Sequence, residues 1–192
     1  MPYGDEDIIR AMLNAESDVR HTIENELSIE GKSYQFENRE FPPYFSMVLP
    51  TGFEELKPEY AKQKYPHEDR PGIILSNDDM TVNFAFDCTY EDSGEIEPRL
   101  KSYRAFIKKL HPSYVFFSHG VYDLESKLKT AYYDYQGIAF DGDIYYLAFF
   151  TDLPNGGLFG SFNCPAELQG KWEPLARQML RTIKPMPQEE GE

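Results

Sequence analysis

The stretch from residue 114 to residue 164 constrains the fold more than any other part of the chain. It contains four runs that are rich in aromatic and β-branched residues, separated from one another by Gly, Pro, Asn and Asp. The runs cover residues 114–124, 130–140, 143–151 and 158–164. Runs of this composition between turn-forming residues are typical of antiparallel strands. The stretch therefore predicts a four-stranded meander, with a tight turn at Asp141-Gly142.

The second of these runs carries apolar residues on both of its sides. Alternation along a strand places Tyr132 and Ile138 on one face and Tyr133 and Tyr135 on the other. A sheet built from such strands needs cover on both faces. Further strands are predicted over 44–49, 72–76 and 81–87, a short hairpin over 23–38, and a short helix that begins at Pro58.

Two later segments show helical periodicity. An apolar stripe at steps of four and three predicts a helix over 95–110: Ile96, Leu100, Tyr103, Ile107 and Leu110. The other side of that helix is basic, which indicates either a solvated face or a docking surface for something acidic. A second stripe predicts a buried face for a helix over 171–183, with Pro174 in its first turn: Trp172, Leu175, Ala176, Met179 and Ile183.

These elements predict an α/β (α+β) fold, in which an antiparallel sheet of about six or more strands packs between helices. The length of 192 residues fits a single domain, expected over 22–184. An acidic helix is expected before it, within residues 1–21, and a disordered acidic tail after it, over 185–192.

The charge balance limits the classes of partner. The chain has 33 acidic and 19 basic residues, a formal net charge of −14. Such an acidic surface repels nucleic acid and anionic membranes, and tolerates or attracts a basic protein partner. The alternative is that the charge serves solubility alone. No run reaches the roughly 20 apolar residues of a membrane span. The first residues are acidic where a signal peptide is basic, so we expect a cytoplasmic protein whose Cys88 and Cys164 are reduced.

Catalytic signatures are absent from the sequence. No histidine pairs with another His or Cys at zinc-ligand spacing, and there is no glycine-rich phosphate loop or nucleophile elbow. A Cys–His pair assembled in space, for example Cys164 with His119, stays open as an alternative. Lone cysteines in strands are more often small buried hydrophobes. We therefore expect no cofactor, no metal and no catalytic site.

The order of elements resembles the PsbP-like superfamily. The likeness rests on Phe45–Pro50 followed by Phe53, then on Lys64-Tyr65-Pro66, Arg70-Pro71, Ile73-Ile74, Val82–Phe84, and Gly160–Cys164 before Trp172. The superfamily includes the extrinsic subunit of photosystem II and a yeast Ran-binding nuclear-import factor, and within it the chain is similar to uncharacterised bacterial proteins. The resemblance implies an antiparallel sheet between helices and a non-enzymatic role in binding or assembly. It supplies no catalytic residue.

The most distinctive polar stretch is the loop from Lys64 to Pro71. Pro66 and Pro71 restrict its backbone, while Tyr65, His67 and Arg70 are residue types that interfaces favour. We therefore predict that the loop is a rigid edge of a protein-binding surface. The structural alternative is that Arg70 pairs with Glu68 or Asp69 and merely closes the loop.

Two other functions stay open. One is a small-ligand carrier, which a deep apolar cavity lined by Tyr133, Tyr135 or Phe149 would favour. The other is a small enzyme with an unrecognised Cys/His or carboxylate site. The oligomeric state is not predicted.

Overall fold

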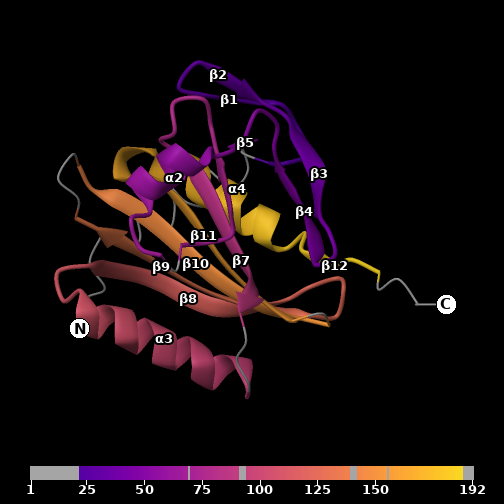
Figure 1. Ribbon diagram of the computed structural model, residues 1–192, viewed down its shortest axis with the longest axis vertical. Helices are drawn as coiled ribbons and strands as arrows, with labels where there is room; N and C mark the ends of the chain where they lie inside the picture. Colours follow the sequence, from indigo (N-terminus) through magenta and orange to yellow (C-terminus); the bar gives the residue numbers. More distant parts are fainter. Residues whose placement is uncertain (1–21, 69, 91–93, 139–141, 155, 188–192) are drawn as a thin grey trace, which may run out of the picture.

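The computed structural model describes residues 22–68, 70–90, 94–138, 142–154 and 156–187. The expected N-terminal helix, the Asp141 end of the predicted turn and most of the expected tail lie outside these ranges. Figure 1 shows a fold dominated by strands, in which a large twisted sheet separates α3 from α4.

The large sheet has seven strands, all paired antiparallel, in the order β5-β6-β7-β11-β10-β9-β8. Its strands are β5 (Glu54–Glu55), β6 (Ile73–Ser76), β7 (Asn83–Tyr90), β8 (Val115–Asp123), β9 (Lys129–Gly137), β10 (Ile144–Leu153) and β11 (Gly156–Pro165). The last four strands are the predicted meander, and β6 and β7 match the strands predicted over 72–76 and 81–87. The prediction of six or more antiparallel strands is therefore confirmed.

Two smaller sheets use the N-terminal part of the chain. The strands β1 (Leu27–Ile29) and β2 (Lys32–Tyr34) form the predicted hairpin. The other small sheet has the order β12-β4-β3, with β3 (Phe36–Phe41), β4 (Phe45–Pro50) and β12 (Lys184–Pro185). Because Pro185 pairs with Phe45, ordered structure continues into the segment expected to be a disordered tail.

The main core lies between the large sheet, the three-stranded sheet and α4 (Gln169–Leu180). The predicted stripe of α4 is buried, and Trp172 has an exposed fraction of 0%. Its indole packs against Tyr34, Phe53 and Phe162, with ring centroids 5.1, 6.0 and 6.0 Å away. The predicted bounds are wrong: the helix runs from Gln169 to Leu180, so Pro174 lies inside it and not in its first turn. Ile183 lies beyond its end but is buried as expected.

The opposite face of the large sheet carries two helices. Ile96 and Leu100 of α3 (Ile96–Leu110) share a buried cluster with Tyr133 and Phe150 of the sheet. Farther along the same face, Ala61 of α2 (Pro58–Lys64) packs with residues of β6 and β7. Tyr133 and Tyr135 pack in the α3 cluster whereas Tyr132 packs against the main core, as expected. Ile138, expected on the same face as Tyr132, instead lies beyond the end of β9 and is exposed.

Candidate functional site

The loop that follows α2 crosses the large sheet at the level of β6 and β7. Pro58 begins α2, and the helix ends where the Tyr65 N–H donates to the Ala61 carbonyl at 2.8 Å. Ala61 anchors the helix against Ile74 and Ala85. The sheet therefore fixes the start of the predicted binding loop.

Lys64 and Tyr65 join a chain of buried polar groups beneath the loop. Register places Ser76 of β6 opposite Asn83 of β7, and Asn83 opposite Asn163 of β11. Ser76 Oγ and Lys64 Nζ both donate to Asn83 Oδ1 at 2.8 Å, and Lys64 also donates to the Met80 carbonyl.

The amide groups continue this chain toward the tyrosine. Asn83 Nδ2 donates to Asn163 Oδ1 at 2.9 Å, and Asn163 Nδ2 donates to the Tyr65 hydroxyl at 3.3 Å. Asn83 and Asn163 are buried, so their mutual hydrogen bond removes a desolvation cost that an unpaired amide would carry.

The buried environment beneath the loop changes the pKa values of Lys64 and Tyr65. Lys64 as a residue is exposed, but its ammonium group lies against protein atoms and loses hydration, which lowers its pKa from 10.5 to about 8. Burial raises the pKa of the Tyr65 hydroxyl. A pocket of about 320 Å³ opens beside Lys64, and Asn163, Asp143 and Glu167 also line it.

Arg70 and His67 lie on the other side of the loop. Arg70 Nη1 donates to the His67 carbonyl at 3.2 Å and to the Tyr65 carbonyl at 3.5 Å, while the His67 residue is exposed. Arg70 thus closes the loop through backbone oxygens. The alternative with Glu68 as its partner is not what the structure shows, and Asp69 lies outside the described residues.

A second pocket, of about 410 Å³, lies below Arg70. Tyr44, Arg70, Gly72, Ile73, Phe86, Asp87 and Cys88 line it. Burial, together with the nearby charge of Asp87, raises the pKa of the Cys88 thiol to about 11. The thiol is therefore protonated at neutral pH, and the pocket offers shape, an aromatic ring and a guanidinium rather than a nucleophile.

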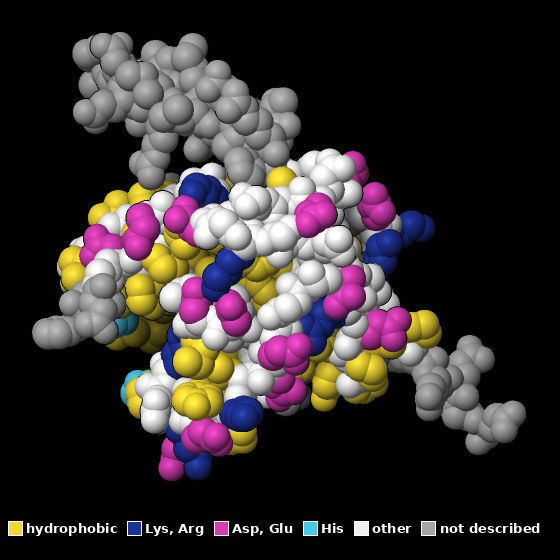
Figure 2. Space-filling view, turned by 90° about the horizontal axis from the view of Figure 1, so that it is seen from above, with side chains coloured by type: hydrophobic (Ala, Val, Ile, Leu, Met, Phe, Trp, Pro, Cys, Tyr) yellow, Lys and Arg dark blue, Asp and Glu magenta, His cyan; other side chains and the backbone are white. Residues whose placement is uncertain are grey.

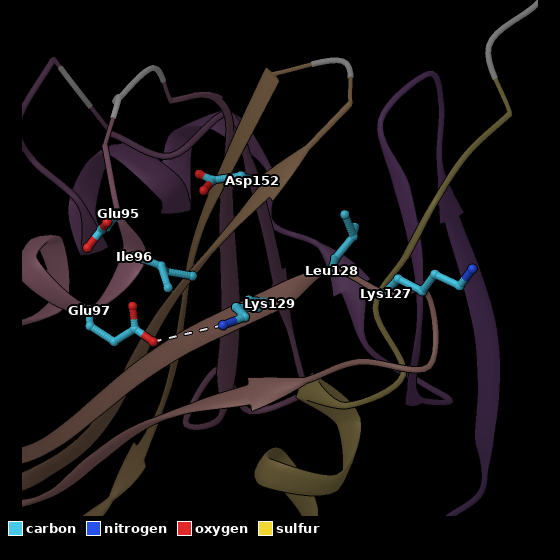
Figure 3. Close-up of a pocket in the computed structure, with 7 residues that line it drawn as sticks. All are labelled: Glu95, Ile96, Glu97, Lys127, Leu128, Lys129 and Asp152. Carbon is cyan, nitrogen blue, oxygen red and sulfur yellow. Dashed lines mark ion pairs between the residues drawn. The ribbon is translucent and has the colours of Figure 1, made fainter.

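A third pocket, of about 570 Å³, lies where α3 begins. Figure 3 shows the carboxylates of Glu95, Glu97 and Asp152 around it, with the Lys129 ammonium 3.9 Å from Glu97. Asp152 also pairs with Arg99 at 2.5 Å. The acidic side chains around this third pocket are thus partly neutralised by neighbouring cations. The pocket is therefore a weaker candidate for a binding site than the two pockets beside the loop.

The structure separates the suggested Cys164–His119 pair. Cys164 is buried on β11 and His119 is exposed on β8, and β10 and β9 lie between these strands. Three strand spacings of about 4.8 Å separate the two backbones by roughly 14 Å, too far for a hydrogen bond. Burial also raises the pKa of the Cys164 thiol. No group of three or more potential metal ligands occurs in the described part of the chain.

The aromatic residues named for a carrier do not share a cavity in the described ranges. Tyr133 and Tyr135 pack in the cluster with α3, and Phe149 packs in the core on the other face of the sheet. A Cβ placed on Gly160 would lie 2.2 Å from Phe149, so that ring covers the glycine backbone directly.

Sequence reasoning missed the two asparagines and a second polar network. Arg177 of α4 pairs with the fully buried Asp134 of β9 at 2.7 Å, and Tyr145 and Ser118 also donate to that carboxylate. Asp134 and Asn163 each interrupt an otherwise apolar or aromatic strand, which is the signal that could have identified them.

Comparison with known proteins gives a fold and no family. No family model matches the chain, and no curated protein matches it in sequence. The cyanobacterial PsbP protein CyanoP from Synechocystis is similar in structure, with a TM-score of 0.52 and 9% identity over 84% of this chain and 98% of that one. The chain thus has a sheet-dominated α+β fold like that of CyanoP, in agreement with the PsbP-like resemblance.

Two further solved structures match more loosely. A Pseudomonas aeruginosa protein of unknown function has a TM-score of 0.47 and 12% identity, over 80% of this chain and 99% of that one. A Bacteroides thetaiotaomicron protein has a TM-score of 0.47 and 18% identity, over 77% of this chain and 46% of that one.

Proposed function

We propose that this protein is a non-catalytic binding module of the PsbP-like type, which engages a protein partner through the loop from Lys64 to Pro71 and the pocket of about 410 Å³ beneath Arg70. The observation that carries the proposal is the closure of the loop by Arg70, which donates to the carbonyls of Tyr65 and His67. A loop closed before docking loses little conformational entropy when a partner binds.

The residues that line the pocket are suited to binding a protein side chain rather than to catalysing a reaction. Tyr44 and Ile73 supply apolar walls, and Arg70 supplies a planar cation of the kind found at interface hot spots. Both thiols have raised pKa values, which disfavours a thiolate nucleophile. In Figure 2, acidic and basic side chains are interspersed over the face seen from above, so the excess acid forms no single docking patch there.

In the described part of the chain, no helix is long and apolar enough to cross a membrane.

A substitution that fills the pocket tests this proposal. Gly72 lines the pocket, and a Cβ placed on it meets no atom within 4 Å, so Gly72→Leu directs a side chain into this open space. Gly170 in α4 has similar open space, and Gly170→Leu is the matched control. The wild-type protein first captures its partner from a cytoplasmic extract, and the purified partner is then titrated against each variant.

We expect Gly72→Leu to lower the affinity for the partner by about tenfold or more, or about 1.4 kcal/mol in binding free energy. Gly170→Leu should leave that affinity unchanged. Both variants should keep the wild-type melting temperature. A partner that binds Gly72→Leu as tightly as wild type would show that this pocket is not the binding site.

A further inference from the structure

The strand β8 forms one edge of the seven-stranded sheet. It covers Val115–Asp123 and pairs with β9 alone among the described strands. Figure 1 shows it beside α3, at the margin of the sheet that is remote from α2. An edge strand of nine residues offers a row of backbone groups to any extended chain that reaches it.

The hairpin geometry shows which of these groups point outward. Leu124 donates its N–H to the Leu128 carbonyl at 2.8 Å, which sets the hydrogen-bonded pairs with β9 at the even-numbered residues nearest the turn. Hydrogen-bonded and non-hydrogen-bonded pairs alternate in an antiparallel ladder. The N–H and C=O groups of His119, Val121 and Asp123 therefore point away from β9.

The surface beside this edge is mainly basic, with Glu97 and Asp123 at its margin and Glu97 paired with Lys129. Residues 98–122 contain no aspartate or glutamate, although the whole sequence has 33 acidic residues. Lys101, Arg104 and Lys108 lie at helical spacing along one stripe of α3. The guanidinium of Arg104 lies 5.3 Å from the ring centroid of Phe116 in β8, so the middle of the stripe lies beside the edge strand.

These three cations make no ion pair within the described ranges, and Arg104 Nε is buried there without a hydrogen-bond partner. The edge thus combines outward-facing backbone groups with uncompensated positive charge.

We propose that β8 binds an extended acidic segment of a protein partner as an additional strand of the sheet. The segment would hydrogen-bond to the outward-facing groups of His119, Val121 and Asp123. Its acidic side chains at alternate positions would face the stripe of Lys101, Arg104 and Lys108. This surface goes beyond the proposed function, because five strand spacings of about 4.8 Å, roughly 24 Å in all, separate β8 from β6.

The dimensions and charges favour this occupant. The stripe spans about 10.5 Å at 1.5 Å per helical residue, and three alternate residues of a strand span about 13 Å. A second copy of the chain would bring its own cations against the same stripe, so charge complementarity favours an acidic partner. The net charge of −14 opposes this only weakly, because screening over about 8 Å at physiological salt confines the attraction to nearby groups.

A designed peptide tests the proposal by standing in for the acidic segment of the partner. The probe is a fluorescent peptide of about eight residues in which Glu and Val alternate, and its control alternates Lys and Val. We expect the Glu-Val peptide alone to bind, and the amides of His119, Val121 and Asp123 to gain protection in hydrogen exchange. If the Glu-Val peptide does not bind at about 1 mM, or binds without protecting these amides, the proposal is wrong.

Paired variants test the two contacts separately. His119→Pro removes an outward N–H and blocks the edge, whereas His119→Thr keeps the N–H. Lys101→Glu with Lys108→Glu reverses the stripe, whereas Lys62→Glu with Lys109→Glu makes the same charge change elsewhere. We expect His119→Pro and the Lys101→Glu, Lys108→Glu double variant to lower the affinity for the peptide by about tenfold or more. The two control variants should lower that affinity by less than about twofold.

Equal binding by the two His119 variants would exclude strand pairing, and equal loss from the two double charge variants would exclude the stripe. If His119→Pro fails to fold, hydrogen exchange on the wild-type protein still decides the backbone contact.

Discussion

Removal of the Arg177 guanidinium should be among the most destabilising single changes to a polar residue of this protein. Its Nη2 lies 2.7 Å from Asp134 Oδ2, and Asp134 has an exposed fraction of 0%. Breaking a buried ion pair by removing one partner costs about 3–5 kcal/mol, since an uncompensated charge is left behind. The guanidinium also lies 4.5 Å from the Tyr132 ring centroid, a contact that contributes about 0.5–2 kcal/mol.

Other interactions reduce this cost. The Arg177 side chain is 18% exposed, so water screens part of the attraction, and Ser118 and Tyr145 still donate to the carboxylate. We therefore expect Arg177→Met to lower the free energy of unfolding by about 3 kcal/mol, the lower end of the range. For a chain of this size, the melting temperature should fall by about 6–12 °C.

Denaturant unfolding of a double-mutant cycle tests this reasoning. Asp134→Asn removes the buried charge but keeps a hydrogen-bonding group, so it should cost less, about 1–2 kcal/mol. The double variant should be more stable than the sum of the two losses predicts, by about 1 kcal/mol or more. A loss below about 1 kcal/mol for Arg177→Met, or simple additivity in the cycle, would refute the claim that the cation compensates a buried carboxylate.

Three further predictions concern the core, the loop and the thiols. Trp172→Ala should cost about 3–5 kcal/mol in denaturant unfolding, because the buried indole fills the space between three aromatic rings. Lys64 should titrate near pH 8 by NMR, below its unfolded value of 10.5. The unfolded chain then holds this proton more tightly, so the stability of wild type relative to Lys64→Met should rise between pH 8 and 10.5. Cys88 and Cys164 should both titrate as free thiols, and Cys164 should react with a thiol reagent only after unfolding, since it is buried and its pKa is raised.

The local pattern of the sequence was enough to predict most elements of the fold. The runs between 114 and 164 alternate in the way that β8 to β11 require, and the stripe beginning at Ile96 has the period of α3. Pairings between distant segments were not predicted, because register depends on which strands meet in space. Asn83 opposite Asn163 and Phe45 opposite Pro185 are of this kind.

The sequence predicted the loop of the candidate site but not its contacts, because those contacts also join distant segments. Prolines around the loop indicated a restricted backbone, and the residue types indicated binding. Sequence could not show that Arg70 donates to carbonyls or that Lys64 reaches Asn83, since both contacts depend on how the loop crosses the sheet.

The small sheet has a consequence for synthesis on the ribosome. Its middle strand β4 pairs with β3, which precedes it closely, and with β12, which follows α4 and is made much later. The indole of Trp172 likewise fills a space between Tyr34 and Phe53, which emerge much earlier. The nascent chain therefore holds the aromatic side chains of these early strands uncovered until α4 and β12 have been made. Protection by a chaperone matters during that interval, and premature termination before α4 would yield an aggregation-prone product.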